Sequence, residues 1–236
     1  MNTILFDLDG TLAPFQQDEF INAYFGLLVK KLTPMGYHGD QLIQALWKGV
    51  SAMIKNDGSY TNRQVFWKVF TQELGAQALA LESILDSFYT QEFDAVRSVL
   101  RGNPDRSGML RALREKGYQL VLATNPIFPA AALETRLRWV GLASSDFQYV
   151  TDYENSRHSK PNPDYYRDIL TAVDRQGGDC LMIGNNPVDD MSAGEVGMAL
   201  FLVTDCIENP DHLPVNQFPH GSFAELEMML EGLPAC

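Results

Sequence analysis

Short apolar runs alternate with helical segments between Arg101 and Val203, and this alternation constrains the fold more than any other feature. The pattern predicts strands at residues 119–123, 147–151, 180–183 and 199–203, and helices at residues 107–116, 130–140, 163–173 and 192–196. An earlier apolar run at residues 3–8 predicts a first buried strand. Such alternation is typical of an α/β fold, in which a parallel sheet is covered by helices on both faces.

A long helical segment interrupts this pattern after the first strand. Residues 14–98 have helical spacing of apolar side chains, with breaks at residues 33–36 and 56–59, and contain no strand of comparable strength. We therefore predict two domains. Residues 1–13 and 99–236 form a discontinuous core, and residues 14–98 form an inserted helical domain.

Charge and composition exclude several classes of protein. The 18 Lys and Arg residues are scattered and the net charge is -12, so nonspecific binding to nucleic acid is not expected. The three cysteines, which are far apart, form no zinc or disulfide pattern. No apolar run is long enough to span a membrane and no signal peptide precedes the first strand, so we expect a cytoplasmic protein without a membrane partner.

Two aspartates follow the first strand. Asp7 and Asp9 are two residues apart, which places their side chains on the same side of an extended chain. The carboxyl end of a first parallel strand faces the usual ligand crevice of an open sheet. Gly10 allows a sharp turn and close approach of a ligand. On this motif alone, an ordinary aspartate-rich turn is an equally good interpretation.

Three more polar clusters follow later strands. Residues 124–126 predict a helix start at Pro126, with a hydroxyl and free amides that suit a phosphate group. Lys160 lies in a loop that Pro161 and Pro163 stiffen, and residues 184–190 include a pair of aspartates after a strand. Taken singly, these are also a plain helix cap, a solvated lysine and acids that complement a helix dipole.

Together, the four clusters resemble the signature motifs of the haloacid dehalogenase superfamily. The matching segments, in order, are residues 7–12, 124–125, 160–161 and 184–190. The resemblance implies a Rossmann-like core of three layers with an α-helical cap of the C1 type, as in phosphoglycolate phosphatases. It also implies hydrolysis of a phosphate monoester through an aspartyl-phosphate intermediate.

The resemblance implies a role for each matching residue. Asp7 would be the nucleophile, and Asp9 would protonate the leaving oxygen and then activate water. Lys160 would neutralise the nucleophile and the transferring group. Thr124 and Asn125 would hold the phosphoryl oxygens, close to the backbone turn at Gly10.

The same resemblance implies a Mg²⁺ site. Its ligands would be Asp7, the main-chain carbonyl of Asp9, Asp190 and Asp189. A divalent cation also fits the physics, because converging carboxylates repel one another and Mg²⁺ prefers oxygen ligands. The family commonly has an acid where this chain has Asn185. An amide oxygen there carries no charge, so we expect weaker metal binding.

Asp9 indicates phosphate chemistry, because the dehalogenases that name the superfamily lack an aspartate at this position. The expected substrate is a small phosphorylated metabolite. A phosphosugar mutase or a dehalogenase-like hydrolase is the alternative within the superfamily. A binding protein that has lost turnover is the alternative outside enzymes, and Asn185 is its only support.

The helical insertion is expected to select the substrate. Its candidate side chains for an anionic leaving group are Lys48, Lys55, Arg63 and Lys68, although each is individually typical of a solvated helix face. Trp47, Phe66 and Trp67 are expected to form the core of the insertion rather than a platform for the substrate.

Overall fold

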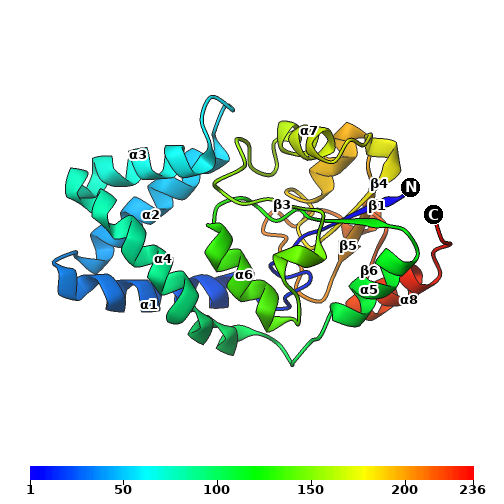
Figure 1. Ribbon diagram of the computed structural model, residues 1–236, viewed down its shortest axis with the longest axis horizontal. Coiled ribbons are helices and arrows are strands. Elements are labelled where there is room, and N and C mark those ends of the chain that lie inside the picture. Colours follow the sequence, from blue (N-terminus) through cyan, green and yellow to red (C-terminus); the bar gives the residue numbers. More distant parts are fainter.

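The computed structural model describes residues 1–236 and contains one six-stranded sheet (Figure 1). The strands are β1 (Thr3–Phe6), β2 (Gln119–Leu122), β3 (Tyr149–Val150), β4 (Cys180–Gly184), β5 (Ala199–Val203) and β6 (His220–Gly221). They are ordered β3-β2-β1-β4-β5-β6, and every neighbouring pair is parallel. The predicted α/β fold with a parallel sheet is therefore confirmed.

Helices cover both faces of the sheet. Successive side chains of a strand point to opposite faces, and here both sets are apolar. Ile4 and Phe6 point into the larger core, whereas Leu5 points into a separate, smaller core. The larger core includes side chains from α5 (Ser107–Glu115), α6 (Ala130–Trp139) and α8 (Phe223–Glu231). The smaller core includes side chains from α7 (Pro163–Ala172) and the 3₁₀-helix η6 (Met191–Val196).

The inserted segment is helical throughout, as the sequence predicts. We call residues 17–99 the helical block. Its elements are α1 (Gln17–Leu32), η1 (Thr33–Met35), α2 (Gly39–Ile54), α3 (Asn62–Leu74), η2 (Ala76–Ala80), α4 (Leu81–Gln91) and η3 (Phe93–Val99). The α-helices of this block gather on one side of the molecule, and α6 lies between them and the sheet (Figure 1). The domain limits at residues 13–14 and 98–99 stay predictions.

The start of α3 is fastened to the core. Asn62 is fully buried, and its backbone N–H donates to the carbonyl of Ser156 over 2.8 Å. Its side-chain amide donates to the carbonyl of Pro126 and to the hydroxyl of Ser159, both over 3.0 Å. One side chain of the helical block therefore joins two separate loops of the core.

The end of the chain differs from the prediction. Residues 199–203 are not the last strand, because β6 and α8 follow them. β6 has only two residues, His220 and Gly221, and therefore lacks an apolar run that would predict a strand. α8 did carry a signal, since Ser222 and Glu225 form a capping box in front of a helix with regularly spaced apolar residues.

The segment after β2 also differs. No helix begins at Pro126, because α6 starts at Ala130, after Pro129. The N–H of Ile127 donates to the carbonyl of Asn125 over 2.8 Å, which folds residues 125–127 into a tight turn instead. The predicted helix start at Thr124–Pro126 is therefore wrong, and the phosphate-binding roles of Thr124 and Asn125 stay predictions.

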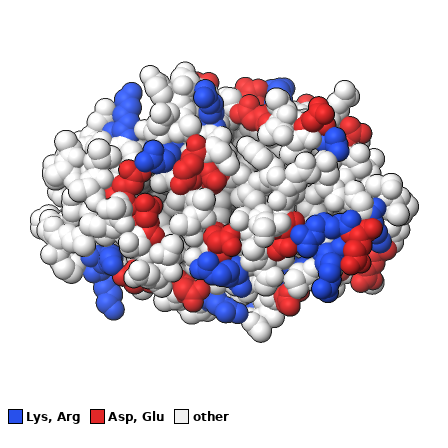
Figure 2. All heavy atoms as spheres, viewed as in Figure 1, with Lys and Arg blue, Asp and Glu red and all other residues white.

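The remaining short 3₁₀-helices are η4 (Ser144–Asp146), η5 (Gly177–Asp179) and η7 (Val215–Gln217). No helix in the chain combines the length and the apolarity needed to cross a membrane. Acidic and basic side chains are interspersed on the face in Figure 2, with uncharged surface between them.

Candidate active site

The predicted site residues lie where the direction of strand order changes. The chain runs from β1 to β2 and β3 on one side, and β4 to β6 lie on the other side. Asp7 follows β1, and its N–H donates to the carbonyl of Ile183 in β4 over 2.8 Å. Asn185 directly follows β4. Such a switch point, at the carboxyl ends of the strands, is the usual place for a ligand crevice.

Lys160 and two aspartates form a buried ion cluster at this point. The Lys160 Nζ donates to Asp7 Oδ1 over 2.8 Å and to Asp190 Oδ1 over 2.6 Å. Burial lowers the pKa of Lys160, but Asp190 and Asp7 outweigh this effect and hold that pKa well above its usual range. Burial raises the pKa of Asp7 to about 8, although Lys160 opposes this shift. The lysine is therefore charged and compensates two carboxyl groups.

The turn after β1 needs glycine at residue 10. Gly10 has a φ of 79°, and its N–H donates to the carbonyl of Ala13 over 2.8 Å. A side chain at this position would collide with the amide of Asn185. The turn also directs the Thr11 hydroxyl to the Asn185 Oδ1 over 3.1 Å. Gly10, which was predicted to assist phosphate binding, thus uses its own N–H inside the turn.

Asn185 is held on both sides of its amide. Its Nδ2 donates to the carbonyl of Cys206 over 2.7 Å, and its Oδ1 accepts from Thr11. These two bonds fix the orientation of the amide and leave one lone pair on Oδ1. Asn185 therefore presents a neutral oxygen at the position where the family commonly has an acid.

Asp190 organises the turn after β4. Its Oδ2 accepts from the backbone N–H groups of Asn185 and Asn186, both over 2.9 Å, while its Oδ1 binds Lys160. A side chain at Gly184 would collide with this carboxylate. Asp190 consequently has little acceptor capacity left for another ligand, whereas Asp189 has more.

Asp9 is paired with an arginine that sequence analysis missed. The Nη1 of Arg136 donates to Asp9 Oδ2, and the guanidinium lies 4.3 Å from the ring centre of Phe128. Burial raises the pKa of Asp9, and Arg136 opposes this shift. Asp9 Oδ1 is buried without a hydrogen-bond partner. A signal for Arg136 did exist, because it shares the apolar face of α6 with Ala132 and Leu133.

Thr124, Asn125 and Asp189 lie on the neighbouring wall of the crevice. Thr124 is buried, and its carbonyl accepts from the hydroxyl groups of Thr151 and Tyr165, both over 2.8 Å. The Asn125 Nδ2 lies 3.4 Å from Asp189 Oδ2, and its Oδ1 is buried without a partner. Burial, followed by the charge of Asp190, raises the pKa of Asp189 to about 6.

Glu208 is a further acid that sequence analysis missed. It lies after β5, and its N–H donates to the carbonyl of Asn185 over 3.0 Å. Burial and the charge of Asp189 raise its pKa. Glu208 belongs to no motif, so only its place beyond a strand end could have indicated it. It gives the site a carboxylate beside the uncharged Asn185.

These side chains line a single crevice of about 230 Å³. The predicted residues in its wall are Asp7, Asp9, Thr124, Asn125, Lys160, Asn185, Asp189 and Asp190, and Glu208 joins them. Gly10 lines an adjoining hollow instead. The structure thus brings together every predicted polar side chain of the site.

The cations proposed for the leaving group do not line this crevice. Lys48 pairs with Glu73 over 2.6 Å, and Arg63 pairs with Glu82. Lys55 and Lys68 also lie outside its wall. The expectation that these side chains meet the substrate has no support in the structure.

The aromatic residues of the helical block divide into two groups. Phe66 and Trp67 are buried, as expected for its core. Trp47 was expected in that core but is 46% exposed and lines the crevice. It lies where the helical block meets the site.

The donor atoms of the crevice suit a hard cation. No three acidic, histidine or cysteine side chains surround one point closely enough to hold an ion by themselves. The crevice nevertheless offers carboxylate and amide oxygens, including the Oδ1 of Asn185, which accepts only from Thr11. Mg²⁺ binds through one or two carboxylates and keeps several waters, so this donor set fits it.

The fold and the site together are typical of a class of hydrolases: a parallel sheet has an aspartate pair after its first strand and a buried lysine bonded to Asp7. Residues 1–197 match the family described as haloacid dehalogenase-like hydrolase. The chain belongs to this family of hydrolases.

Two curated relatives align over most of the chain. A phosphoglycolate phosphatase of Vibrio vulnificus is 27% identical over 202 residues, which cover 85% of this chain and 82% of that protein. A pyrophosphatase, PpaX, of Bacillus pumilus is 23% identical over 203 residues, which cover 84% of this chain and 80% of that protein.

Solved structures show the same fold. A HAD phosphatase from Thermococcus onnurineus has a TM-score of 0.60 at 20% identity, with 99% of this chain and 100% of that chain covered. L-2-haloacid dehalogenase from Xanthobacter autotrophicus has a TM-score of 0.58 at 16% identity, with 99% of each chain covered. The HAD-hydrolase YfnB from Bacillus subtilis, described as bound to magnesium, has a TM-score of 0.55 at 20% identity, with 97% and 98% covered.

Proposed function

We propose that this hydrolase is a magnesium-dependent phosphatase, which cleaves a small phosphate monoester through an aspartyl-phosphate on Asp7. The observation that carries the proposal is the contact of 2.8 Å between Asp7 Oδ1 and the buried Lys160 Nζ at the switch point of the sheet. This contact leaves Asp7 Oδ2 free for attack, except for a weak bond of 3.3 Å from Thr11. The names of the two curated relatives support phosphate chemistry.

The reaction uses the two aspartates in turn. Asp7 Oδ2 forms a bond to phosphorus while the ester P–O bond breaks, and Asp9 gives its proton to the leaving oxygen. Asp9 then takes a proton from water, which attacks phosphorus and releases Asp7 and free phosphate. Arg136 holds Asp9 at the edge of the crevice. Lys160 offsets the negative charge that the phosphoryl group brings next to Asp7.

The proposed Mg²⁺ would be held by Asp7, the main-chain carbonyl of Asp9, the amide oxygen of Asn185 and Asp189. Asp190 is also among the predicted ligands, but its carboxylate already holds Lys160 and the turn after β4, so positioning these two is its chief role. Glu208 would be a further ligand of the ion and would supply the negative charge that Asn185 lacks. When bound, the ion would neutralise negative charge on the phosphoryl oxygens.

The proposal is tested by measuring phosphate release from p-nitrophenyl phosphate by the full-length protein. Turnover should require added Mg²⁺ and should disappear when a chelator such as EDTA is in excess. Activity should return when Mg²⁺ exceeds the chelator. Equal turnover with and without the chelator would contradict the metal requirement, and the absence of turnover on a panel of phosphate monoesters would contradict the function.

Charge at residues 185 and 208 should set the affinity for Mg²⁺. Glu208→Gln should weaken binding by about tenfold, because one full charge near the ion is lost. Asn185→Asp should strengthen it by a similar factor. The same substitution should lower the melting temperature without metal, because a carboxylate would face the carbonyl of Cys206 at the position of a 2.7 Å hydrogen bond.

Isothermal titration with Mg²⁺ and the metal-dependent shift in melting temperature measure both effects without reference to turnover. Asn103→Asp is the matched control, because Asn103 is exposed and lies outside the crevice. Unchanged affinity in Glu208→Gln would remove Glu208 from the proposed set of ligands. Unchanged affinity in Asn185→Asp would remove Asn185 from the same set.

A further inference from the structure

A second cavity adjoins the catalytic crevice on the side of the helical block. The crevice and this cavity are neighbours, because they share five lining residues: Gln17, Ile21, Trp47, Val50 and Ile127. The volume of the cavity is about 80 Å³, whereas one water needs roughly 10–15 Å³ on the same basis. It can therefore take a chemical group of several heavy atoms next to the reacting phosphate.

The wall of this cavity is apolar and aromatic. Fourteen of its 18 lining residues are hydrophobic, which makes it unlike the polar crevice that it joins. Its aromatic side chains include Phe20, Tyr24, Phe66, Trp67 and Tyr153. They come from α1, α3 and the core loop after β3. The helical block and the core thus enclose the cavity together.

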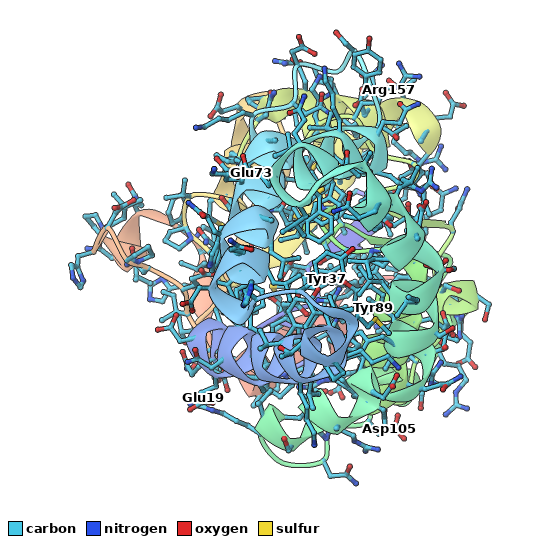
Figure 3. The ribbon with its side chains drawn as sticks, turned by 90° about the vertical axis from the view of Figure 1, so that its left-hand side faces the viewer. Glu19, Tyr37, Glu73, Tyr89, Asp105 and Arg157 are labelled. Carbon is cyan, nitrogen blue, oxygen red and sulfur yellow. The ribbon has the colours of Figure 1, made fainter.

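Two of the polar groups in the wall satisfy each other. The hydroxyl groups of Tyr24 and Tyr89 are 2.6 Å apart and bind each other. Figure 3 shows Tyr89 in the interior of the helical block, between α1 and α4, whereas Glu19 and Glu73 lie at its outer edge. The Trp67 Nε1 is buried without a hydrogen-bond partner. The Trp67 N–H is thus one polar group that this aromatic wall leaves open.

No cation lines the cavity. Its charged residues are Glu82, which pairs with Arg63, and Asp86. The single cation in the adjoining crevice wall is Lys160, which two carboxylates already bind. A carboxylate or a second phosphate on the leaving group would therefore lose its water without gaining a counter-charge.

We propose that the substrate is a phosphate monoester whose leaving group is neutral and largely apolar, of about the size of an aromatic ring. This inference rests on the proposed phosphatase function and names its substrate class. The ring would occupy the cavity between α1, α2 and α3 while the phosphate lies in the crevice, next to Asp7 Oδ2 and Lys160. Phosphoglycolate and pyrophosphate, for which the two curated relatives are named, are then poor substrates of this chain.

Matched pairs of esters test this substrate class. We expect kcat/KM for phenyl phosphate to exceed that for 4-carboxyphenyl phosphate by at least about tenfold, and benzyl phosphate to exceed phosphoglycolate similarly. The first pair is a stringent test. The added carboxylate makes the phenol a slightly better leaving group, which by itself would favour 4-carboxyphenyl phosphate. A preference for phenyl phosphate must then come from binding.

A positive charge placed where the crevice meets the cavity should reverse the preference for the ester without a carboxylate. Val50→Lys should raise the ratio of kcat/KM for 4-carboxyphenyl phosphate to that for phenyl phosphate by at least about tenfold. Trp47→Lys is the second variant, because Trp47 is 46% exposed and tolerates a polar replacement more readily. Leu79→Lys is the control, since Leu79 is 55% exposed and lines neither space. It should leave the ratio unchanged.

The outcomes separate this inference from the function on which it rests. Turnover of all four esters with equal or better rates for the carboxylated ones would overturn the substrate class and leave the phosphatase function intact. An unchanged ratio in both lysine variants would overturn the placement of the leaving group in this cavity. The absence of phosphate release from every ester would overturn the function, and the substrate class with it.

Discussion

Asp7→Asn should lower kcat for phosphate release by on the order of 10⁴-fold or more, because the amide cannot form the covalent intermediate. The effect should be on turnover and not on binding. Lys160 keeps its bond of 2.6 Å to Asp190, so the phosphate still meets a charged amine. The measurement is single-turnover release of phosphate, together with phosphate binding by titration. Retained turnover in this variant would remove Asp7 as the nucleophile.

The same variant should be stable, and its stability should depend less on pH than that of the wild type. Burial raises the pKa of Asp7 from 3.8 to about 8, with Lys160 opposing the shift. The stabilisation linked to this group is present below pH 4 and is lost as the pH rises through 8. Asparagine has no proton to lose. Metal-free Asp7→Asn should therefore keep, between pH 4 and 8, stability that the wild type loses.

Lys160→Met should destabilise the metal-free protein by about 3–5 kcal/mol, the usual cost of removing one partner from a buried ion pair. Lys160 is 1% exposed and joins Asp7 to Asp190. Without the amine, two buried carboxyl groups face each other with no cation between them. Urea unfolding in the presence of a chelator measures this loss.

Lys48→Met is the matched control for that measurement. Lys48 also forms an ion pair of 2.6 Å, with Glu73, but the Lys48 side chain is 46% exposed. An exposed pair contributes about 0–1 kcal/mol, so this variant should change stability little. Similar losses in both variants would show that the Lys160 cluster is not the buried, mutually dependent group described above. The double variant Lys160→Met with Asp7→Asn should recover part of the lost stability.

Much of the fold could be predicted because its signals are local. Each strand of the alternating region has an apolar run, and the polar motifs lie directly beyond the strand ends. Parallel strands deliver those ends to the same edge of the sheet. For this reason, residues as distant in the chain as Asp7, Lys160 and Asp190 could be assigned to one crevice, where the structure places them.

The rest depended on contacts that a local pattern does not encode. The turn at residues 125–127 replaced a predicted helix start, although Asn followed by Pro is a common helix signal. Arg136 lies on the apolar face of α6, but its partner Asp9 is 127 residues away in the chain, so the pair could not be predicted from a local pattern. Glu208 lies in a loop without a motif and enters the crevice through a backbone contact with Asn185.

The contacts of Asn62 tie the access route to the chemistry. Its amide bridges the loop that follows Thr124 and the residue before Lys160, through Pro126 and Ser159. The Ser159 hydroxyl in turn donates to the carbonyl of Met53 in α2 over 3.1 Å. An outward movement of the helical block would break its bonds to the loop after Thr124 and to the loop that carries Lys160. An opening movement of the helical block would therefore also disturb the position of Lys160, the next residue after Ser159.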